Sequence, residues 1–406
     1  MSAPSALRVA MVGHAFMGTA HSQAWRTVNR VFDLPATAVM QVVCGRDAAR
    51  TQEAADRLGW AHAATDWREV VERDDIDLVD VCTPGDSHAE IAVAALQAGK
   101  HVLCEKPLAN TVEQAERMVE AARAAAARGV RSMVGFNYRR VPAAALARQL
   151  VEQGRLGEIR HVRAQYLQDW IIDPEFPLVW RLQKERAGSG ALGDLGAHII
   201  DLAQYVTGQA IGGVSALTET FISERPLADA STGLSATGGS RTGGSRTVGS
   251  RTGGSRTGRV SVDDAALFLA RFGRGAIGTF EATRFATGHK NGLRLEVEGS
   301  RGAIRFDFEA MNELQFYDAT DPAATAGFRR ILVTEPDHPY MSAWWPAGHL
   351  IGYEHTFTHE LRDLIEAIAT GRDPRPSFAD GLQVQRVLGA VQDSAARSSA
   401  WTAIPG

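Results

Sequence analysis

Residues 7–18 read LRVAMVGHAFMG, an apolar run that ends in a turn bounded by two glycines. Apart from Arg8, the first six residues are apolar and predict a strand that is buried on both faces. A helix is expected to follow from about Gly18 to Phe32. Glycines between a strand and a helix let the backbone approach a diphosphate, which the helix N-terminus attracts. Ala15 replaces the middle glycine of the G-x-G-x-x-G pattern, so the turn alone is a weak sign of a dinucleotide site. The assignment needs support from the surrounding sequence.

That support comes from the regular alternation of strands and helices up to residue 136. Apolar runs at 38–43, 61–63, 77–82, 101–104 and 131–136 predict further strands, separated by helical patterns at 48–58, 66–73, 87–98 and 111–128. Buried strands that alternate with helices indicate a parallel sheet with helices on both faces. The expected fold class is therefore α/β, with a doubly wound Rossmann domain over residues 1–138.

After residue 138 the pattern changes to that of an α+β domain, expected over 139–406. A helix (142–153) and a strand (158–168) precede a loop rich in Pro and Trp (169–187) and a helix that starts at about residue 193. Strand-like runs with Gly and Asp turns follow, and they indicate a largely antiparallel sheet with one covered face. Helices are expected at 354–369 and 378–398. Residues 237–258 repeat Gly-Ser-Arg-Thr, which predicts a low-complexity surface loop at about 229–259.

Composition excludes several classes of protein. The net charge of −4 gives no general attraction to nucleic acid or to anionic membranes, and no apolar run approaches the roughly 20 residues that span a bilayer. The first strand pattern starts too early for a secretory signal. Three cysteines without a CxxC pair fit a reducing compartment. We therefore expect a soluble, cytoplasmic chain that binds neither nucleic acid nor membrane.

The segment GDLGAHIIDL (193–202) carries three titratable residues in an apolar setting. On a helix, Asp194, His198 and Asp201 form one polar stripe, since residues four and seven apart share a face. Burying an unpaired charge is costly, so the stripe either pairs internally or meets a ligand. A core histidine held by a carboxylate is the simpler reading of this segment taken by itself. For Asp201, a supporting role near the site and a purely structural pair are equally open.

The end of the second predicted strand bears on the choice of dinucleotide. Enzymes that prefer NAD usually place an acid there for the ribose diol, whereas this chain has Gly45 followed by Arg46. A missing acid beside an arginine favours the 2′-phosphate of NADP. Asp47 either caps the next helix or reaches the ribose itself.

The strand at 101–104 runs into Glu105-Lys106-Pro107, at the edge where open α/β sheets bind ligands. With this motif and Asp194…His198, the sequence resembles the family of glucose-fructose oxidoreductase, inositol dehydrogenase and rhizopine-catabolism oxidoreductases (Gfo/Idh/MocA). The family carries Glu-Lys-Pro here and Asp-x-x-x-His on a helix of its second domain. The segments TPGDSH (83–88), GFNYR (135–139), Trp180-Arg181 and 354–381 are also similar, so that the resemblance covers nearly the whole chain.

The resemblance implies a site in the cleft between the two domains. There Lys106 would polarise the reacting oxygen, His198 would act as the base and Asp194 would orient the histidine or bind a neighbouring hydroxyl. The residues implied to contact the dinucleotide are Gly13, Ala15, Phe16, Met17, Gly18, Arg46, Thr83, Pro84, His88, Glu105 and Asn137. Those implied to contact substrate are Tyr138, Arg139, Trp180, Arg181, Asp194 and His198. No cluster has metal-ligand spacing, so no metal is expected.

The expected activity is NAD(P)-dependent hydride transfer to or from a hydroxyl or ketone carbon of a sugar, inositol or related polyol. Two alternatives stay open: a glycosidase that oxidises C3 transiently with its NAD bound, and a non-catalytic dinucleotide-binding protein. Family members commonly pair through the second sheet, which implies a homodimer or homotetramer.

Overall fold

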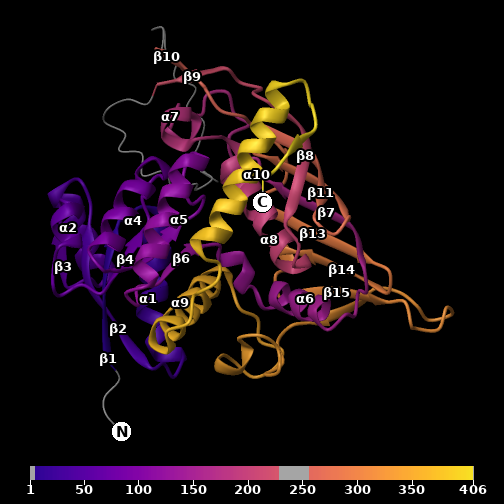
Figure 1. Ribbon diagram of the computed structural model, residues 1–406, viewed down its shortest axis with the longest axis horizontal. Helices are drawn as coiled ribbons and strands as arrows, with labels where there is room; N and C mark the ends of the chain where they lie inside the picture. Colours follow the sequence, from indigo (N-terminus) through magenta and orange to yellow (C-terminus); the bar gives the residue numbers. More distant parts are fainter. Residues whose placement is uncertain (1–4, 228–255, 406) are drawn as a thin grey trace, which may run out of the picture.

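The computed structural model describes residues 5–227 and 256–405, which form two large sheets (Figure 1). The first sheet is wholly parallel, with strand order β3-β2-β1-β4-β5-β6. Its strands are β1 (Ser5–Val12), β2 (Ala36–Cys44), β3 (His62–Ala64), β4 (Leu78–Val81), β5 (His101–Glu105) and β6 (Ser132–Gly135). This order, which runs outward in both directions from β1 and β4, confirms the predicted Rossmann arrangement.

The helices between these strands begin and end at local sequence signals. They are α1 (Phe16–Val31), α2 (Ala48–Leu58), α3 (Trp67–Val71), α4 (His88–Gln97) and α5 (Val112–Ala126). The Asp47 carboxylate accepts the Arg50 N–H at 2.9 Å where α2 begins, and the Thr111 hydroxyl accepts that of Gln114 at 3.2 Å where α5 begins. Each cap satisfies a backbone donor that the first helical turn leaves free.

The second sheet has nine strands in the order β16-β15-β14-β13-β7-β12-β11-β8-β17. Every named neighbouring pair is antiparallel except β7 with β12. This confirms the predicted, largely antiparallel sheet. The strands are β7 (Ile159–Leu167), β8 (Ile211–Glu219), β11 (Ala265–Phe272), β12 (Ile277–Thr283), β13 (Gly292–Gly299), β14 (Gly302–Asp307), β15 (Glu313–Asp318), β16 (Arg329–Leu332) and β17 (Thr402–Ala403).

One face of this sheet is covered by helices α6 (Pro142–Glu152), α8 (Ala197–Thr207) and α10 (Phe378–Ala396). The period-two pattern of β11 shows the result: Phe268 and Phe272 are buried, whereas Leu267 and Leu269 are exposed. In a strand, alternate side chains point to opposite faces, so the second face of the sheet carries apolar side chains in contact with solvent.

Helices α9 (Tyr353–Thr370) and α10 lie between the two sheets (Figure 1). Helix α9 packs against α1, and Phe357 and Leu361 share a core with Trp25 and Val28. The end of the chain therefore returns to the helical layer of the Rossmann sheet.

The short remaining elements lie on either side of the repeat region. Helix α7 (Lys184–Ala187) precedes α8, and strands β9 (Glu224–Pro226) and β10 (Thr257–Arg259) pair antiparallel. Most of the predicted low-complexity loop falls in residues 228–255, outside the described residues, while its predicted last residues, Thr257–Arg259, form β10. None of the described helices combines the length and apolar character needed to cross a membrane.

Candidate active site

The turn between β1 and α1 leaves no room for a side chain at either of its two glycines. Gly13 has a φ of +98°, and a Cβ atom there would lie 2.8 Å from the Cys82 carbonyl oxygen. A Cβ atom at Gly18 would lie 2.2 Å from the Gly13 carbonyl oxygen, so the helix can approach the turn only without a side chain. Ala15, at the N-cap, makes no side-chain bond to the first helical N–H groups. An uncapped N-terminus beside a glycine turn fits the diphosphate of a dinucleotide.

The end of β2 lies next to this turn. A Cβ atom at Gly45 would come within 2.4 Å of both His14 Nε2 and Thr51 Oγ1, which explains why glycine stands where an acid is usual. Asp47 caps α2, which is one of the two roles predicted for it. Arg46 is exposed and free to reach a ribose or a 2′-phosphate at this edge.

The loop after β4 contributes Thr83, Pro84 and His88. The His88 ring faces two carbonyl oxygens, with Nδ1 3.0 Å from that of Pro107 and Nε2 2.8 Å from that of Thr83. His88 is buried and ties this loop to the one that follows Lys106. The histidine therefore positions two loops of the predicted dinucleotide edge.

Lys106 lies at the carboxyl end of β5 and reaches across to the second half of the chain. Its Nζ donates to the backbone carbonyl of Asp194 at 2.8 Å and lies 3.5 Å from Asp194 Oδ1. The Lys106 side chain is 13% exposed, so little water screens this contact. This contact joins Lys106, which follows a strand of the first sheet, to Asp194, which lies 88 positions later beside the second sheet.

The predicted polar stripe begins in an irregular turn rather than in a regular helix. Leu192–Gly196 forms a π-helical turn, and the regular helix α8 begins only at Ala197. A π turn holds more residues than an α turn, so the register of Asp194 relative to His198 differs from that of a regular α-helix. No hydrogen bond joins Asp194 to His198 within the described part of the chain.

Asp194 lies among cations instead. Burial alone raises the pKa of this carboxyl, but the charges of Lys106, Arg181 and Arg284 outweigh burial and hold the pKa below its usual value. Arg284 Nη1 lies 4.0 Å from Asp194 Oδ2, and its side chain is fully buried. Arg284 is not among the residues predicted from the sequence, because an arginine after a strand looks like a surface residue until the fold covers it.

The His198 ring lies in an aromatic pocket. Its centroid is 4.5 Å from that of Tyr138, and the rings of Phe136 and Tyr166 lie 6.3 Å and 5.9 Å away. Burial, followed by the charge of Lys106, lowers the pKa of His198 well below its ordinary value. The imidazole is therefore neutral near pH 7, and its buried Nδ1 has no hydrogen-bond partner among the described residues.

A hydrogen-bond chain extends from this pocket to the adjoining ends of the inner strands β7 and β13 of the second sheet. The hydroxyls of Tyr138 and Tyr166 are 2.8 Å apart, and Tyr166 donates to Asn291 Oδ1 at 2.7 Å. Gln168 donates to the same oxygen at 2.8 Å. The sequence indicates Tyr138 but not the other three residues: Tyr166 and Gln168 lie at the end of β7, and Asn291 directly precedes β13, so they meet Tyr138 only in the fold.

Several predicted residues have partners that leave them little freedom. Arg139 donates twice to Asp201, through Nε at 2.8 Å and Nη2 at 2.5 Å, and both side chains are buried. This pair favours the structural reading of Asp201, and we leave Arg139 out of the proposed substrate site. Asn137 Nδ2 donates to Thr356 Oγ1 at 2.8 Å. Glu105 is also buried, and its carboxylate lies 2.9 Å from His21 Nε2 and accepts the backbone N–H of Lys106 at 3.1 Å.

Trp180 and Arg181 form a stacked pair, with the guanidinium carbon 4.5 Å from the Trp180 ring centroid. Arg181 is among the cations that lower the pKa of Asp194, so the pair borders the Lys106–Asp194 contact. This position is compatible with the predicted substrate contact.

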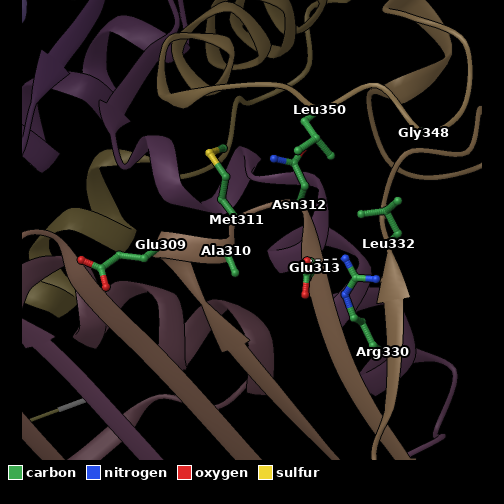
Figure 2. Close-up of a pocket in the computed structure, with 9 residues that line it drawn as sticks. All are labelled: Glu309, Ala310, Met311, Asn312, Glu313, Arg330, Leu332, Gly348 and Leu350. Atoms are coloured by element: carbon green, nitrogen blue, oxygen red, sulfur yellow. Dashed lines mark hydrogen bonds and ion pairs between the residues drawn. The ribbon is translucent and has the colours of Figure 1, made fainter.

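A hollow of about 500 Å³ lies away from these residues, beneath the segment that carries Gly348 and Leu350 (Figure 2). Glu309, Glu313 and Arg330 contribute its charged side chains. None of the predicted site residues lines it, so it is not the site described above.

Comparisons with known proteins agree with this geometry. Residues 7–136 match the family profile described as an oxidoreductase family with an NAD-binding Rossmann fold, and residues 144–305 match the GFO/IDH/MocA C-terminal domain. Levoglucosan dehydrogenase of Pseudarthrobacter phenanthrenivorans is 43% identical over 98% of both chains.

Solved structures extend the likeness to three dimensions. An oxidoreductase domain protein from Kribbella flavida is 60% identical, with a TM-score of 0.91 over 99% of this chain and 100% of that one. A levoglucosan dehydrogenase in complex with NADH and levoglucosan is 41% identical, with a TM-score of 0.89 over the same shares. The two family profiles together match most of the chain, and the chain belongs to the GFO/IDH/MocA family of oxidoreductases.

Proposed function

We propose that this protein oxidises a secondary hydroxyl of levoglucosan or of a close anhydrosugar, with Lys106, Asp194 and His198 as the reacting constellation. Its family and its relatives make it an NAD-dependent dehydrogenase of sugars or polyols. The relative at 43% identity over nearly the full length supports the narrower substrate. The observation that carries the catalytic proposal is the Lys106 Nζ contact to Asp194 across the two halves of the chain, beside a neutral His198.

The glycine turn fits the cofactor. Gly13 and Gly18 leave the backbone open, and Ala15, Phe16 and Met17 present the N-terminus of α1 without a side-chain cap. When bound, the nicotinamide of NAD supplies the acceptor for a hydride. Thr83 and Pro84 border the same edge of the sheet, and Asn137 follows its last strand.

In the proposed reaction, the neutral imidazole of His198 accepts the proton of the substrate hydroxyl. The Lys106 ammonium donates to the same oxygen and stabilises the alkoxide that forms. Asp194 holds Lys106 in place through its carbonyl and carboxylate oxygens. The reverse reaction uses the same groups, with His198 returning the proton.

Turnover of a sugar panel tests this proposal. We expect NADH formation with levoglucosan, and turnover reduced by about 10³-fold or more in Lys106→Ala, because that variant loses the charge on the reacting oxygen. Lys100→Ala is the matched control, since Lys100 lies beside the other end of β5 and its Nζ also donates to a backbone carbonyl, that of Arg73 at 2.7 Å. Full turnover in Lys106→Ala would contradict the assigned role.

The same panel separates the alternative functions. Cleavage of glycosides without net NADH formation would identify the glycosidase with transient C3 oxidation. Dinucleotide binding without turnover of any substrate would identify a binding protein. The intact constellation favours the dehydrogenase, since a binding protein has no use for a neutral histidine beside a lysine.

For the dinucleotide, we propose NAD as the main cofactor, because the levoglucosan dehydrogenases were solved with NADH. The preference for NADP that Gly45 and Arg46 suggest stays a prediction. Arg46→Ala tests this preference. If Arg46 contacts the 2′-phosphate, the variant has a higher KM for NADP and an unchanged KM for NAD. A KM for NADP equal to that of the unchanged protein would contradict the preference.

We also propose that the chain forms a homodimer or homotetramer through the open face of the second sheet. Leu217, Leu267, Leu269 and Ile277 are 64%, 47%, 58% and 49% exposed on β8, β11 and β12. Such a contiguous apolar face usually marks an interface. Leu269→Glu should give a smaller particle in analytical ultracentrifugation, whereas Leu350→Glu, an exposed leucine outside this sheet, should not.

We propose the cytoplasm as the site of action, because Cys44, Cys82 and Cys104 are free, buried thiols that a reducing compartment preserves.

A further inference from the structure

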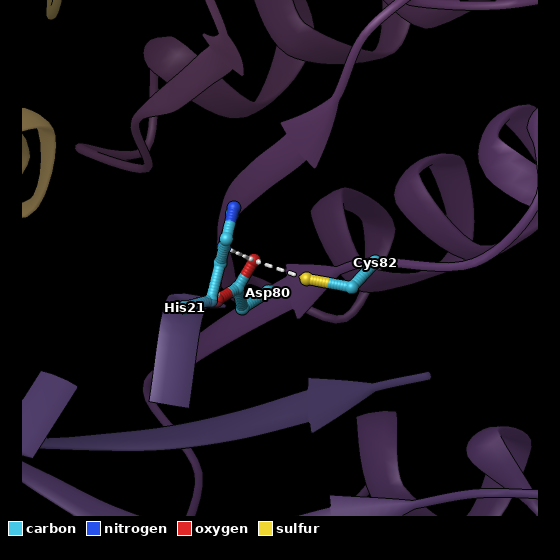
Figure 3. Close-up of side chains that lie close together, drawn as sticks. All are labelled: His21, Asp80 and Cys82. Carbon is cyan, nitrogen blue, oxygen red and sulfur yellow. Dashed lines mark hydrogen bonds and ion pairs between the residues drawn. The ribbon is translucent and has the colours of Figure 1, made fainter. Parts of the chain in front are cut away.

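Beneath Lys106 lies a group of buried titratable side chains that the proposed reaction does not use. Figure 3 shows the Asp80 carboxylate between the His21 ring and the Cys82 sulfur. His21 Nδ1 lies 2.9 Å from Asp80 Oδ2, and the Trp25 indole donates to the same oxygen at 2.8 Å. The other ring nitrogen, His21 Nε2, lies 2.9 Å from Glu105 Oε1. The His21 ring is therefore clamped between two carboxylates.

Both carboxylates accept hydrogen bonds, so the ring is best satisfied when both of its nitrogens carry a proton. Burial lowers the pKa of His21, but the charge and hydrogen bond of Asp80, together with the contribution of Cys82, outweigh burial and raise the pKa well above its ordinary value. The three side chains His21, Asp80 and Cys82 also have the atom types of a metal site. A metal would have to displace the bridging proton and ionise Cys82, whose thiol pKa is raised by burial. A protonated His21 explains the close approach of the two carboxylates, and it requires neither a metal nor an ionised Cys82.

The Glu105 carboxylate connects this cluster to the proposed active site. Its Oε2 accepts the backbone N–H of Lys106 at 3.1 Å, while its Oε1 faces His21. Lys106 Nζ then extends to Asp194 on the far side. The backbone from which the lysine side chain extends is thus held by a buried ion pair.

His21 also belongs to the dinucleotide side of the site. It lies on α1, which begins at Phe16 directly after the glycine turn, and Asp80 lies on the central strand β4. One side chain therefore joins the helix of the glycine turn, a central strand and the strand that carries Lys106.

We propose that His21 is a positioning residue for Lys106: clamped between Asp80 and Glu105, it locks the end of β5 to helix α1 and so holds the lysine where it meets the substrate oxygen. This inference rests on the proposed role of Lys106. A side chain that sets the position of a reacting group by a fraction of an ångström acts on the rate of the chemical step rather than on ligand binding.

His21→Gln tests the proposal, because glutamine is of similar size and cannot bridge two carboxylates as a cation. We expect kcat to fall by about 10- to 100-fold, while the dissociation constant for NADH, measured by fluorescence titration, changes by less than about 3-fold. The matched control is His359→Gln. His359 is equally buried, but its Nδ1 faces the Arg140 carbonyl and its Nε2 accepts the Trp344 N–H, with no link to the Lys106 strand.

The outcomes separate the inference from the function on which it rests. A folded His21→Gln protein with wild-type kcat, or an equal loss of kcat in His21→Gln and His359→Gln, overturns the positioning role. Undiminished turnover in Lys106→Ala instead overturns the proposed function itself. If His21→Gln does not fold, Asp80→Asn removes the other side of the clamp, and it too must lower kcat more than His359→Gln does.

Discussion

Glu360, on α9, is a buried carboxyl whose titration should be visible in the stability of the whole protein. Its side chain is 1% exposed, and neither of its oxygens has a hydrogen-bond partner within the described residues. Arg140 Nη1 is 4.0 Å away. Burial, only partly opposed by Arg140, raises the pKa of Glu360 to about 8. The folded protein therefore keeps this proton at pH 7.

The sign and size of the effect follow from linkage. The unfolded chain, with an ordinary carboxyl pKa of 4.5, loses the proton over a pH range in which the folded chain holds it. Stability therefore falls as the pH rises from about 5 to 8, and this one group contributes about 3 kcal/mol to the loss. With an unfolding entropy of about 2.1 cal/mol/K per residue over 406 residues, this corresponds to about 4 °C in Tm.

Thermal unfolding of Glu360→Gln and of the unchanged protein from pH 5 to pH 8 measures this contribution. Glutamine does not titrate, so the difference in Tm between the two proteins should change by about 4 °C across the range, in favour of the variant at high pH. Other titrating groups cancel in the difference. Glu366→Gln, on the same helix but with a partly exposed side chain, should show no such trend. A Tm difference between Glu360→Gln and the unchanged protein that stays constant from pH 5 to pH 8 would refute the reasoning.

Three further predictions concern the site and its supports. Asp201→Asn leaves the Arg139 charge buried without its partner and should cost about 3–5 kcal/mol in urea unfolding, a loss that a surface pair would not show. Gly18→Ala pushes a Cβ atom to within 2.2 Å of the Gly13 carbonyl, so the dissociation constant for NADH should rise by about 10-fold or more, and unchanged binding would mean that the turn does not hold the cofactor. Because burial and then Lys106 lower the pKa of His198, the fall of kcat/KM on the acid side should lie below pH 6.5. In His198→Gln this fall should be absent, and the rate should be lower by about 10²- to 10⁴-fold.

The features that the sequence predicts are those set by neighbours along the chain. The strand and helix order of the Rossmann half, the glycine turn and the position of Lys106 at a strand end follow from local periodicity and from the geometry of parallel sheets. The antiparallel character of the second sheet follows from period-two alternation in β11 and its neighbours.

The features that escape prediction depend on contacts between distant segments. Arg284 directly follows β12 and Asn291 directly precedes β13, and nothing near them in the sequence distinguishes them from surface residues. Asp194 lies in a π turn, a local change of helical register that residue spacing does not reveal. His21 sits four residues before Trp25 on the buried face of α1, so the one available sign was a histidine on an apolar stripe facing Asp80 in an apolar strand.

The charges around the proposed site explain how a weak base could serve it. Lys106, Arg181 and Arg284 surround the single carboxylate of Asp194, and the positive charge of Lys106 also acts on His198. Burial and then this charge disfavour a proton on the imidazole, and taken alone they would make His198 a poor base. The same positive charge, however, stabilises the alkoxide and so lowers the pKa of the substrate hydroxyl. Proton transfer depends on the difference between the two pKa values, so the cations that weaken the base also weaken the bond from which it takes the proton.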